Sequence, residues 1–172
     1  MLDALSFVDV AHRDVYGVDV DGVSRQLAVN GMLLSPAGDG DHSSVLHSEV
    51  SAGEQVSYLR QLLGERVSHE LDDGRIPLGY CPLCMGNDGW IFAATLILGV
   101  DTVHWSRIGF DTENGFPVSR TGPWWRRREV PVPDDWNWWI VDPVNPELSY
   151  SFDRSAYIDV IRTEIKRLES TP

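Results

Sequence analysis

The chain has 172 residues, of which 42% are hydrophobic and 23% charged, and its formal net charge is -12 at pH 7. This size fits one domain with its own core, and the composition is typical of a soluble globular protein rather than a disordered or fibrous one. The negative charge disfavours nucleic acid and anionic membranes as partners and favours basic proteins. We therefore predict a single domain over residues 1–172.

The longest uncharged apolar run bears on where the protein works. This run, 90–100, is too short to span a bilayer, and the first residues carry acids where a signal peptide needs a basic start. The sequence therefore predicts a cytoplasmic protein. In that reducing compartment we expect Cys81 and Cys84 as thiols or thiolates.

A hairpin and a loop are predicted in the first part of the chain. Alternating apolar residues precede Asp21-Gly22, a dipeptide suited to a two-residue turn, and predict that strand 15–20 pairs with strand 23–28. The following run SPAGDGDHSS, residues 35–44, combines small and polar turn-forming residues without periodicity. It therefore predicts a surface loop.

Two helices are predicted, at about 51–63 and 153–168. Ser51 and Glu54 have the spacing of a capping box, Gly64 is placed to end the first helix, and Asp153 is placed to cap the second. Each segment carries an apolar stripe at helical spacing, formed by Val56, Leu59, Leu62 and Leu63 in the first and by Tyr157, Val160, Ile161, Ile165 and Leu168 in the second. These stripes indicate helices that pack against a core.

The remaining regular elements are strands. Segments 76–81 and 90–98 read as strands, and 102–110 reads as the antiparallel neighbour of the second across a turn at 99–101. Alternation along the third strand puts the large apolar side chain of Trp105 toward the core. Strands followed by strands, with two separated helices, predict the α+β class with a mainly antiparallel sheet.

The two cysteines, in the stretch GYCPLCMGNDGW, allow three interpretations. With His42 and His47 they have the ligand types of a Cys2His2 zinc site, although no second pair has finger-like spacing. A redox pair would need the helix amino terminus that stabilises a thiolate, and Cys84 is instead followed by a turn and a strand. The favoured interpretation is a tight turn with two semi-buried cysteines and no cofactor.

Three segments of the chain carry distinctive residues: RIPLGYCPLCMGNDGW, DTVHWSRIGFDTEN and YSFDRSAYIDVI. Together they resemble an uncharacterised family of short acidic bacterial proteins. Members carry a C-P-x-C-G-D-x-x-C-G turn, a V-x-W-x-x-F-G-[WF] strand and an F-x-F-D-x-x-x-Y helix start. The matching residues lie within 44–161 and are Cys81, Pro82, Cys84, Asp88 and Gly89 in the turn, Trp105, Gly109 and Phe110 in the strand, and Phe152, Asp153 and Tyr157 at the helix start. Some members are labelled oxidoreductases, so the resemblance implies a redox role. This chain lacks the third cysteine of that pattern.

The stretch TGPWWRRREVPVPDDWNWWIVDP holds five of the seven tryptophans, together with three consecutive arginines. Such residues are typical of interface hot spots, so Trp124 and Trp125 are candidates for a binding surface. The alternative is that the tryptophans pack under the sheet with arginines over their faces, because 138–141 reads as an ordinary buried strand. Three arginines do not offset the overall negative charge, which argues against nucleic acid.

Two functions follow from these patterns. We expect a small acidic binding protein of the immunity-protein or antitoxin type, which sequesters a basic partner such as a toxin domain. The predicted partner-binding residues are Asp19, Asp21, Asp39, Asp41, Glu49, Trp124 and Trp125. The alternative is a small thiol-redox or metal-dependent enzyme centred on Cys81 and Cys84. No catalytic residue is predicted for the binding protein.

Overall fold

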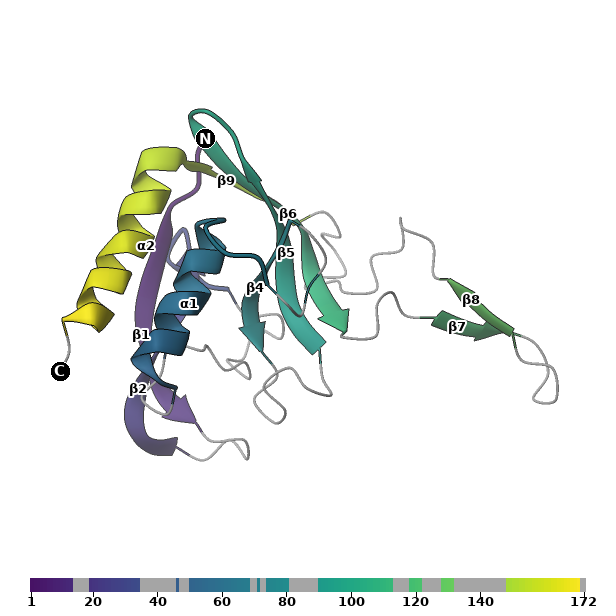
Figure 1. Cartoon of the computed structure of the whole chain (residues 1–172), viewed down its shortest axis with the longest axis horizontal. Coiled ribbons are helices and arrows are strands. Elements are labelled where there is room, and N and C mark those ends of the chain that lie inside the picture. The colour runs from purple at the N-terminus through teal and green to yellow at the C-terminus, as the bar shows by residue number, and fades with distance from the viewer. Residues whose placement is uncertain are drawn as a thin grey trace.

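A computed structural model describes residues 1–13, 19–34, 46, 50–68, 71, 74–80, 90–112, 118–121, 128–131 and 148–170 (Figure 1). Within these ranges the chain forms two helices, a three-stranded sheet, a four-stranded sheet and a two-stranded hairpin. All strands paired within these sheets are antiparallel. The predicted α+β class is confirmed. No helix in the described part of the chain is long and apolar enough to cross a membrane.

The first sheet has the order β1-β2-β3 and consists of β1 (Leu5–Arg13), β2 (Asp19–Val29) and β3 (Met32–Leu33). The turn between β2 and β3 is Asn30-Gly31, whose φ angles of 54° and 77° are positive, as a type I′ turn requires. Asparagine followed by glycine is the commonest sequence for that turn, so this hairpin had a clear signal in the chain.

The predicted hairpin at Asp21-Gly22 is wrong, because both residues lie inside β2. Segment 23–28 pairs with β1, with Val23 opposite Ala11 and Ala28 opposite Ser6. The predicted partner strand 15–20 lies mostly outside the described residues, as does the predicted loop 35–44. Strand β2 pairs with β1 because this pairing buries the apolar inner face of the sheet. That burial outweighs the local turn signal of Asp21-Gly22.

The second sheet has the order β4-β5-β6-β9. Its strands are β4 (Arg75–Tyr80), β5 (Trp90–Leu98), β6 (Thr102–Thr112) and β9 (Tyr150–Asp153). The predicted strands at 90–98 and 102–110 and their antiparallel pairing are confirmed. Two further strands, β7 (Val118–Thr121) and β8 (Arg128–Pro131), pair with each other, and β8 lies within the stretch that holds five of the seven tryptophans.

One irregularity interrupts the long β5–β6 hairpin. The pairing register shifts between Ala93 and Thr95, and across from it Arg107 has a φ of 47°. The carbonyl oxygen of Arg107 accepts a hydrogen bond of 2.6 Å from Arg75 Nη1, which comes from β4. This pattern is that of a β-bulge, in which one extra residue bends the strand, and the Arg75 side chain ties the bend to the neighbouring strand.

The helices form as the sequence predicts. Helix α1 (Ala52–Leu62) begins after Ser51 with a complete capping box, and its C-cap Leu63 is followed by Gly64, whose φ is 68°. The amides of Gly64 and Glu65 donate to the carbonyls of Gln61 and Arg60, which is the Schellman pattern. Helix α2 (Arg154–Glu169) begins after Asp153, whose side chain accepts a hydrogen bond from Ala156 N at 2.9 Å.

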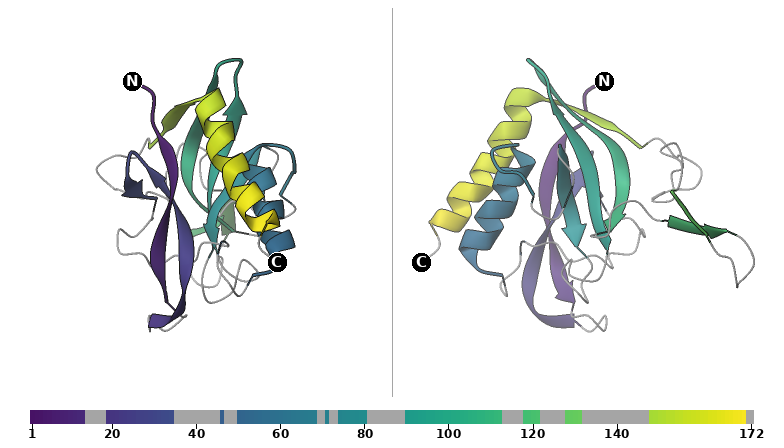
Figure 2. Two further views of the ribbon diagram at one scale, coloured as in Figure 1. Left: turned by 90° about the vertical axis from the view of Figure 1, so that its left-hand side faces the viewer. Right: turned by 45° about the vertical axis from the view of Figure 1, so that its right-hand side comes forward.

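The two sheets meet at one end of β1. Asp3 forms a parallel bridge with Phe152 of β9, and Asp3 N donates to Ser151 O at 2.7 Å. Figure 2 shows the two helices side by side, with the strands of both sheets lying to one side of this pair. A single set of buried apolar side chains therefore comes from both sheets and both helices, and includes Leu5, Leu27, Val29, Leu59, Leu62, Phe92, Val103, Trp105, Phe152, Tyr157 and Ile161.

Candidate functional site

Most residues predicted for partner binding or for metal lie outside the described part of the chain. These are Asp39, Asp41, Glu49, Trp124, Trp125, Cys81, Cys84, His42 and His47. Asp19 and Asp21 belong to β2, but their side chains are not described. Within the described ranges, no group of three or more His, Cys, Asp and Glu side chains could hold a metal ion. The predicted sites therefore stay predictions.

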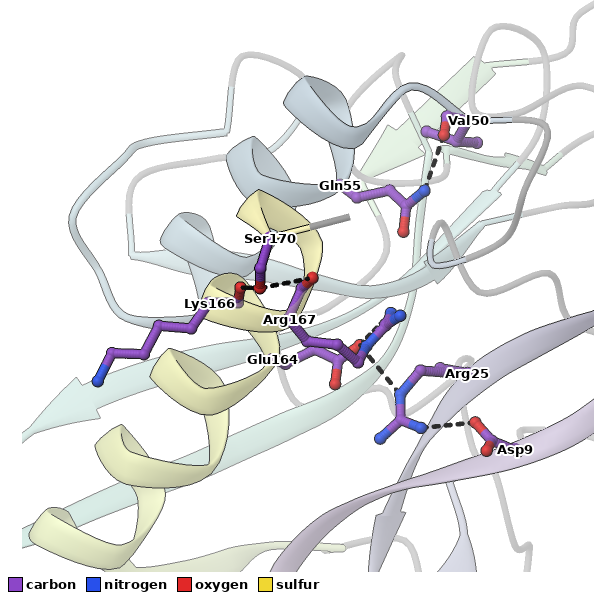
Figure 3. Close-up of polar contacts among 8 residues, drawn as sticks. All are labelled: Asp9, Arg25, Val50, Gln55, Glu164, Lys166, Arg167 and Ser170. Carbon is purple, nitrogen blue, oxygen red and sulfur yellow. Dashed lines mark hydrogen bonds and ion pairs between the residues drawn. The ribbon is translucent and has the colours of Figure 1, made fainter. Parts of the chain in front are cut away.

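The described residues contain a charged cluster that the sequence did not reveal. At its centre is Glu164 of α2, whose side chain is only 4% exposed (Figure 3). It occupies the predicted apolar stripe of α2, between the buried residues Ile161 and Leu168, whereas the predicted stripe residue Val160 is half-buried. A carboxylate that is almost fully buried needs compensating positive charge, so its partners define the site.

Two arginine side chains contact the same carboxylate oxygen, Glu164 Oε1. Arg167 donates to it from Nε at 2.8 Å and from Nη2 at 2.6 Å. Arg25 Nε, from β2, lies 3.0 Å from the same oxygen. That nitrogen is close enough for an ion pair but is not aligned for a hydrogen bond, and no other described acceptor serves it. The cluster therefore combines strong charge pairing with one poorly satisfied donor.

Arg25 joins the cluster to two other segments. Its Nη1 donates to Asp9 Oδ1 at 2.6 Å, across the β1–β2 pair in which Asp9 and Arg25 are directly opposite. Its backbone N donates to Leu46 O at 2.8 Å, and Leu46 is a buried core residue. A single strand residue thus connects β1, α2 and the backbone at Leu46. We call the set Asp9, Arg25, Glu164 and Arg167 the clasp.

A related contact lies at the start of α1. Gln55 is buried, and its Nε2 donates to Val50 O at 2.7 Å, which holds the residue just before the helix cap (Figure 3). Like the clasp, this contact uses a buried polar side chain of a helix to hold a neighbouring segment. Such contacts specify position, because a buried polar group tolerates few alternative arrangements.

A second polar cluster lies where the two sheets meet. Asp3 Oδ1 accepts from Asn30 Nδ2 and Asp3 Oδ2 accepts from Ser151 N, both at 2.8 Å. On β6, His104 Nδ1 lies 2.9 Å from Ser151 Oγ. Burial, with a smaller contribution from the charge of Asp3, raises the pKa of Tyr150 above its usual range. These contacts join β1 to β9 and serve as a structural connection.

The serine–histidine pair at this junction is the nearest approach to a nucleophile and base among the described residues. His104 and Ser151 are directly opposite in the β6–β9 pair, so their contact follows from strand register. The backbone N of Ser151 is already bonded to Asp3, and among the described contacts no carboxylate orients the histidine ring. The contact of His104 with Ser151 is a cross-strand hydrogen bond between paired residues.

The third polar feature lies in the aromatic part of the core. Trp105 Nε1 donates to Tyr157 OH at 3.2 Å, and Tyr157 OH donates to Leu62 O at 2.8 Å. Trp105 packs edge-on against Phe152 and Tyr157, with ring centroids 4.9 and 5.8 Å away. Burial raises the pKa of Tyr157 well above its usual range, although the hydrogen bond from Trp105 acts in the opposite direction. The prediction that Trp105 is a core residue is confirmed.

In chemical terms, the described clusters join segments of the chain, and the clasp carboxylate is held by two guanidinium groups. Comparisons of the chain with protein-family models, curated proteins and solved structures gave no match. The resemblance to a family of short acidic bacterial proteins, inferred from the turn, strand and helix-start motifs, stays a prediction.

Proposed function

We propose that this chain is a small acidic binding protein that acts in the cytoplasm by covering a basic partner protein, in the manner of an immunity protein or antitoxin. The proposal rests on charge. A protein with a net charge of -12 attracts cationic surfaces, and complementary charge speeds encounter and excludes wrong partners. A cationic toxin domain is a partner of that chemistry.

The distribution of that charge is the observation that carries the proposal. Residues 1–100 carry 14 Asp and Glu against five Arg, whereas residues 101–172 carry 12 Asp and Glu against nine Lys and Arg. The excess negative charge therefore lies mainly in the first part of the chain, which includes the predicted binding residues Asp19, Asp21, Asp39, Asp41 and Glu49.

A binding assay with matched variants tests this proposal. The first candidate partner is any basic domain encoded beside the gene, and the measurement is the association rate by stopped-flow fluorescence. Raising salt from about 0.1 M to about 1 M shortens the Debye length from about 10 Å to about 3 Å, so association should slow several-fold. Neutralising Asp39, Asp41 and Glu49 together to the amides should imitate high salt.

The matched control neutralises three exposed acids of the described framework, Asp101, Asp159 and Glu169. It removes the same charge from the whole molecule, so it should slow association less if the predicted residues form the binding surface. Equal effects of both triple variants would reject that surface, and an association rate indifferent to salt would reject the electrostatic proposal. One zinc per chain, or a strongly acidic thiol at Cys81 or Cys84, would favour the enzyme alternative instead.

A further inference from the structure

The turn that joins β5 to β6 carries a group of exposed apolar side chains. Ile97, Leu98 and Val100 are 51%, 43% and 86% exposed, and they lie within four consecutive residues. In Figure 1 and in both views of Figure 2 this turn is the uppermost part of the drawn chain, beyond the start of α2. Apolar side chains scattered singly over a surface are ordinary, whereas a group of them at a projecting turn indicates a contact surface. We call these three residues the tip.

The side chains of the tip point in different directions. Leu98 is directly opposite Val103, which is buried in the core, and Ile97 is directly opposite His104. Because successive strand residues alternate, Leu98 and Ile97 lie on opposite faces of the hairpin, and Val100 lies in the turn between the two strands. A flat surface covers only one of these faces at a time. A concave site that receives the end of the hairpin covers all three side chains together.

Hydrogen bonds hold the turn in one conformation, and two of them come from the start of α2. Gly99 N donates to Thr102 O at 2.8 Å, which closes the turn, and Arg154 N donates to Asp101 O at 3.0 Å. The Arg154 side chain reaches back to the turn, where its Nη1 donates to Gly99 O at 2.8 Å. A binding loop that is already ordered loses less conformational entropy when it binds. The tip is therefore presented in a form that suits it for binding.

The charge around the tip is complementary to a cationic partner. Residues 95–106 contain one acid, Asp101, and no lysine or arginine. Asp101 in the turn and Asp153 at the end of β9 are both exposed. The guanidinium group of Arg154 is directed at the carbonyl of Gly99. A surface that carries basic groups around an apolar pocket therefore approaches the tip without like-charge repulsion.

We propose that the tip is the anchor by which this protein holds its basic partner, and that it enters an apolar pocket with basic residues around the rim. This inference rests on the function proposed above. In this scheme the acids of the first part of the chain speed encounter, and the buried tip slows dissociation. Loss of a buried apolar contact acts mainly on the dissociation rate, so kinetics separate the two contributions.

The dissociation rate of the complex measures the contribution of the tip. The probe is the purified basic domain used for the stopped-flow measurement, mixed with the full chain. Val100→Ser should accelerate dissociation about tenfold and change association less than about twofold, because it removes an anchor but no charge. Met32→Ser is the matched control, since Met32 is 68% exposed in the first sheet, and it should leave both rates nearly unchanged. Equal effects of the two variants would overturn the proposal.

Two variants on opposite faces of the hairpin test the pocket. Ile97→Ala and Leu98→Ala should each accelerate dissociation about fivefold, because a pocket around the tip contacts both side chains. The urea midpoint of each variant shows that it is folded, and Ile97, which is half exposed, is the milder of the two changes. An effect of only one variant would mean that the partner covers a single face, and the pocket would be rejected.

Other occupants of the tip give different results. A second copy of the chain would appear as a dimer when the protein is sedimented alone, and Val100→Ser would weaken that dimer. A lipid surface would appear as co-sedimentation with vesicles of phosphatidylcholine and phosphatidylglycerol that depends on Val100. Either result would reject the proposal. Association indifferent to salt would reject the proposed function and this inference with it, whereas salt-dependent association with unchanged dissociation of Val100→Ser would reject the tip alone.

Discussion

Helix α2 is joined to the two sheets by two buried polar side chains that differ in charge. Tyr157 and Glu164 lie two turns apart on the same face of the helix. Tyr157 is neutral and connects to Trp105 of the second sheet and to the carbonyl of Leu62. Glu164 is charged and connects to Arg25 of the first sheet. Through these two side chains the helix meets the second sheet by neutral hydrogen bonds and the first sheet by an ion pair.

The surroundings of the two side chains explain the difference. The Tyr157 hydroxyl lies among fully buried rings, where a neutral hydrogen bond is tolerated and a charge is not. The partners of Glu164 reach water, because the side chains of Arg25 and Arg167 are 25% and 46% exposed. The aromatic contact therefore makes a rigid connection, whereas the clasp can exchange its partners for water. The following predictions test this contrast, from the largest expected effect to the smallest.

Replacing Trp105 with alanine should destabilise the protein by about 3 to 5 kcal/mol, because it leaves a cavity under the second sheet and removes the donor to Tyr157. Urea unfolding followed by circular dichroism measures the effect. Val100→Ala is the control, since Val100 is 86% exposed on the same hairpin and should change stability little. An unchanged urea midpoint for Trp105→Ala would contradict the role of Trp105 in the contact between α2 and the second sheet.

Replacing Glu164 with alanine should destabilise the protein by about 2 to 3 kcal/mol. Removing one partner of a buried ion pair leaves unpaired charge, and the effect is discounted here because both arginines are partly exposed. Chemical denaturation of this variant beside Glu169→Ala isolates the buried position, since Glu169 is exposed. A loss no larger than that of the control would show that the clasp contributes no more than a surface ion pair.

Replacing Tyr157 with phenylalanine should destabilise the protein by about 1 to 2 kcal/mol. The substitution keeps the ring but removes the hydrogen bonds that Trp105 Nε1 and Leu62 O make with the hydroxyl. Thermal or urea unfolding measures the loss, and Tyr150→Phe is a control at a half-buried tyrosine of the same aromatic group. A neutral outcome for Tyr157→Phe would mean that water or a rearrangement replaces both bonds.

At alkaline pH, the ionisation of Tyr157 in the unfolded chain should lower the stability of the folded protein. Its pKa in the folded protein is raised above the value of about 10 in the unfolded chain. Below pH 10 the hydroxyl is neutral in both states, and above it only the unfolded chain ionises, so stability falls as pH rises toward the folded pKa. At pH 11 the resulting decrease in the free energy of unfolding is about 1.4 kcal/mol. Tyr157→Phe should remove it, so an identical alkaline slope in both proteins would contradict the assignment.

Local signals in the sequence determined the elements whose information lies within a few residues. Ser51 with Glu54, and Asp153 alone, specified where the helices begin, because a capping side chain bonds to an amide only a few positions ahead. Strands β5 and β6 were predictable because a three-residue turn joins a continuous apolar run, 90–98, to a segment, 102–110, in which apolar residues alternate with polar ones around Trp105. The alternation along β6 correctly predicted that Trp105 lies in the core.

Tertiary structure alone decided which distant segments come together. Segment 23–28 paired with β1 rather than with its nearest neighbour, because strand pairing is chosen by the face that can be buried, and that depends on the whole sheet. Glu164 reads in sequence as a charged residue beside an apolar stripe, and its burial depends on Arg25, 139 positions away on β2. No local pattern encodes such a partner, because only packing brings a buried charge and its counterion together.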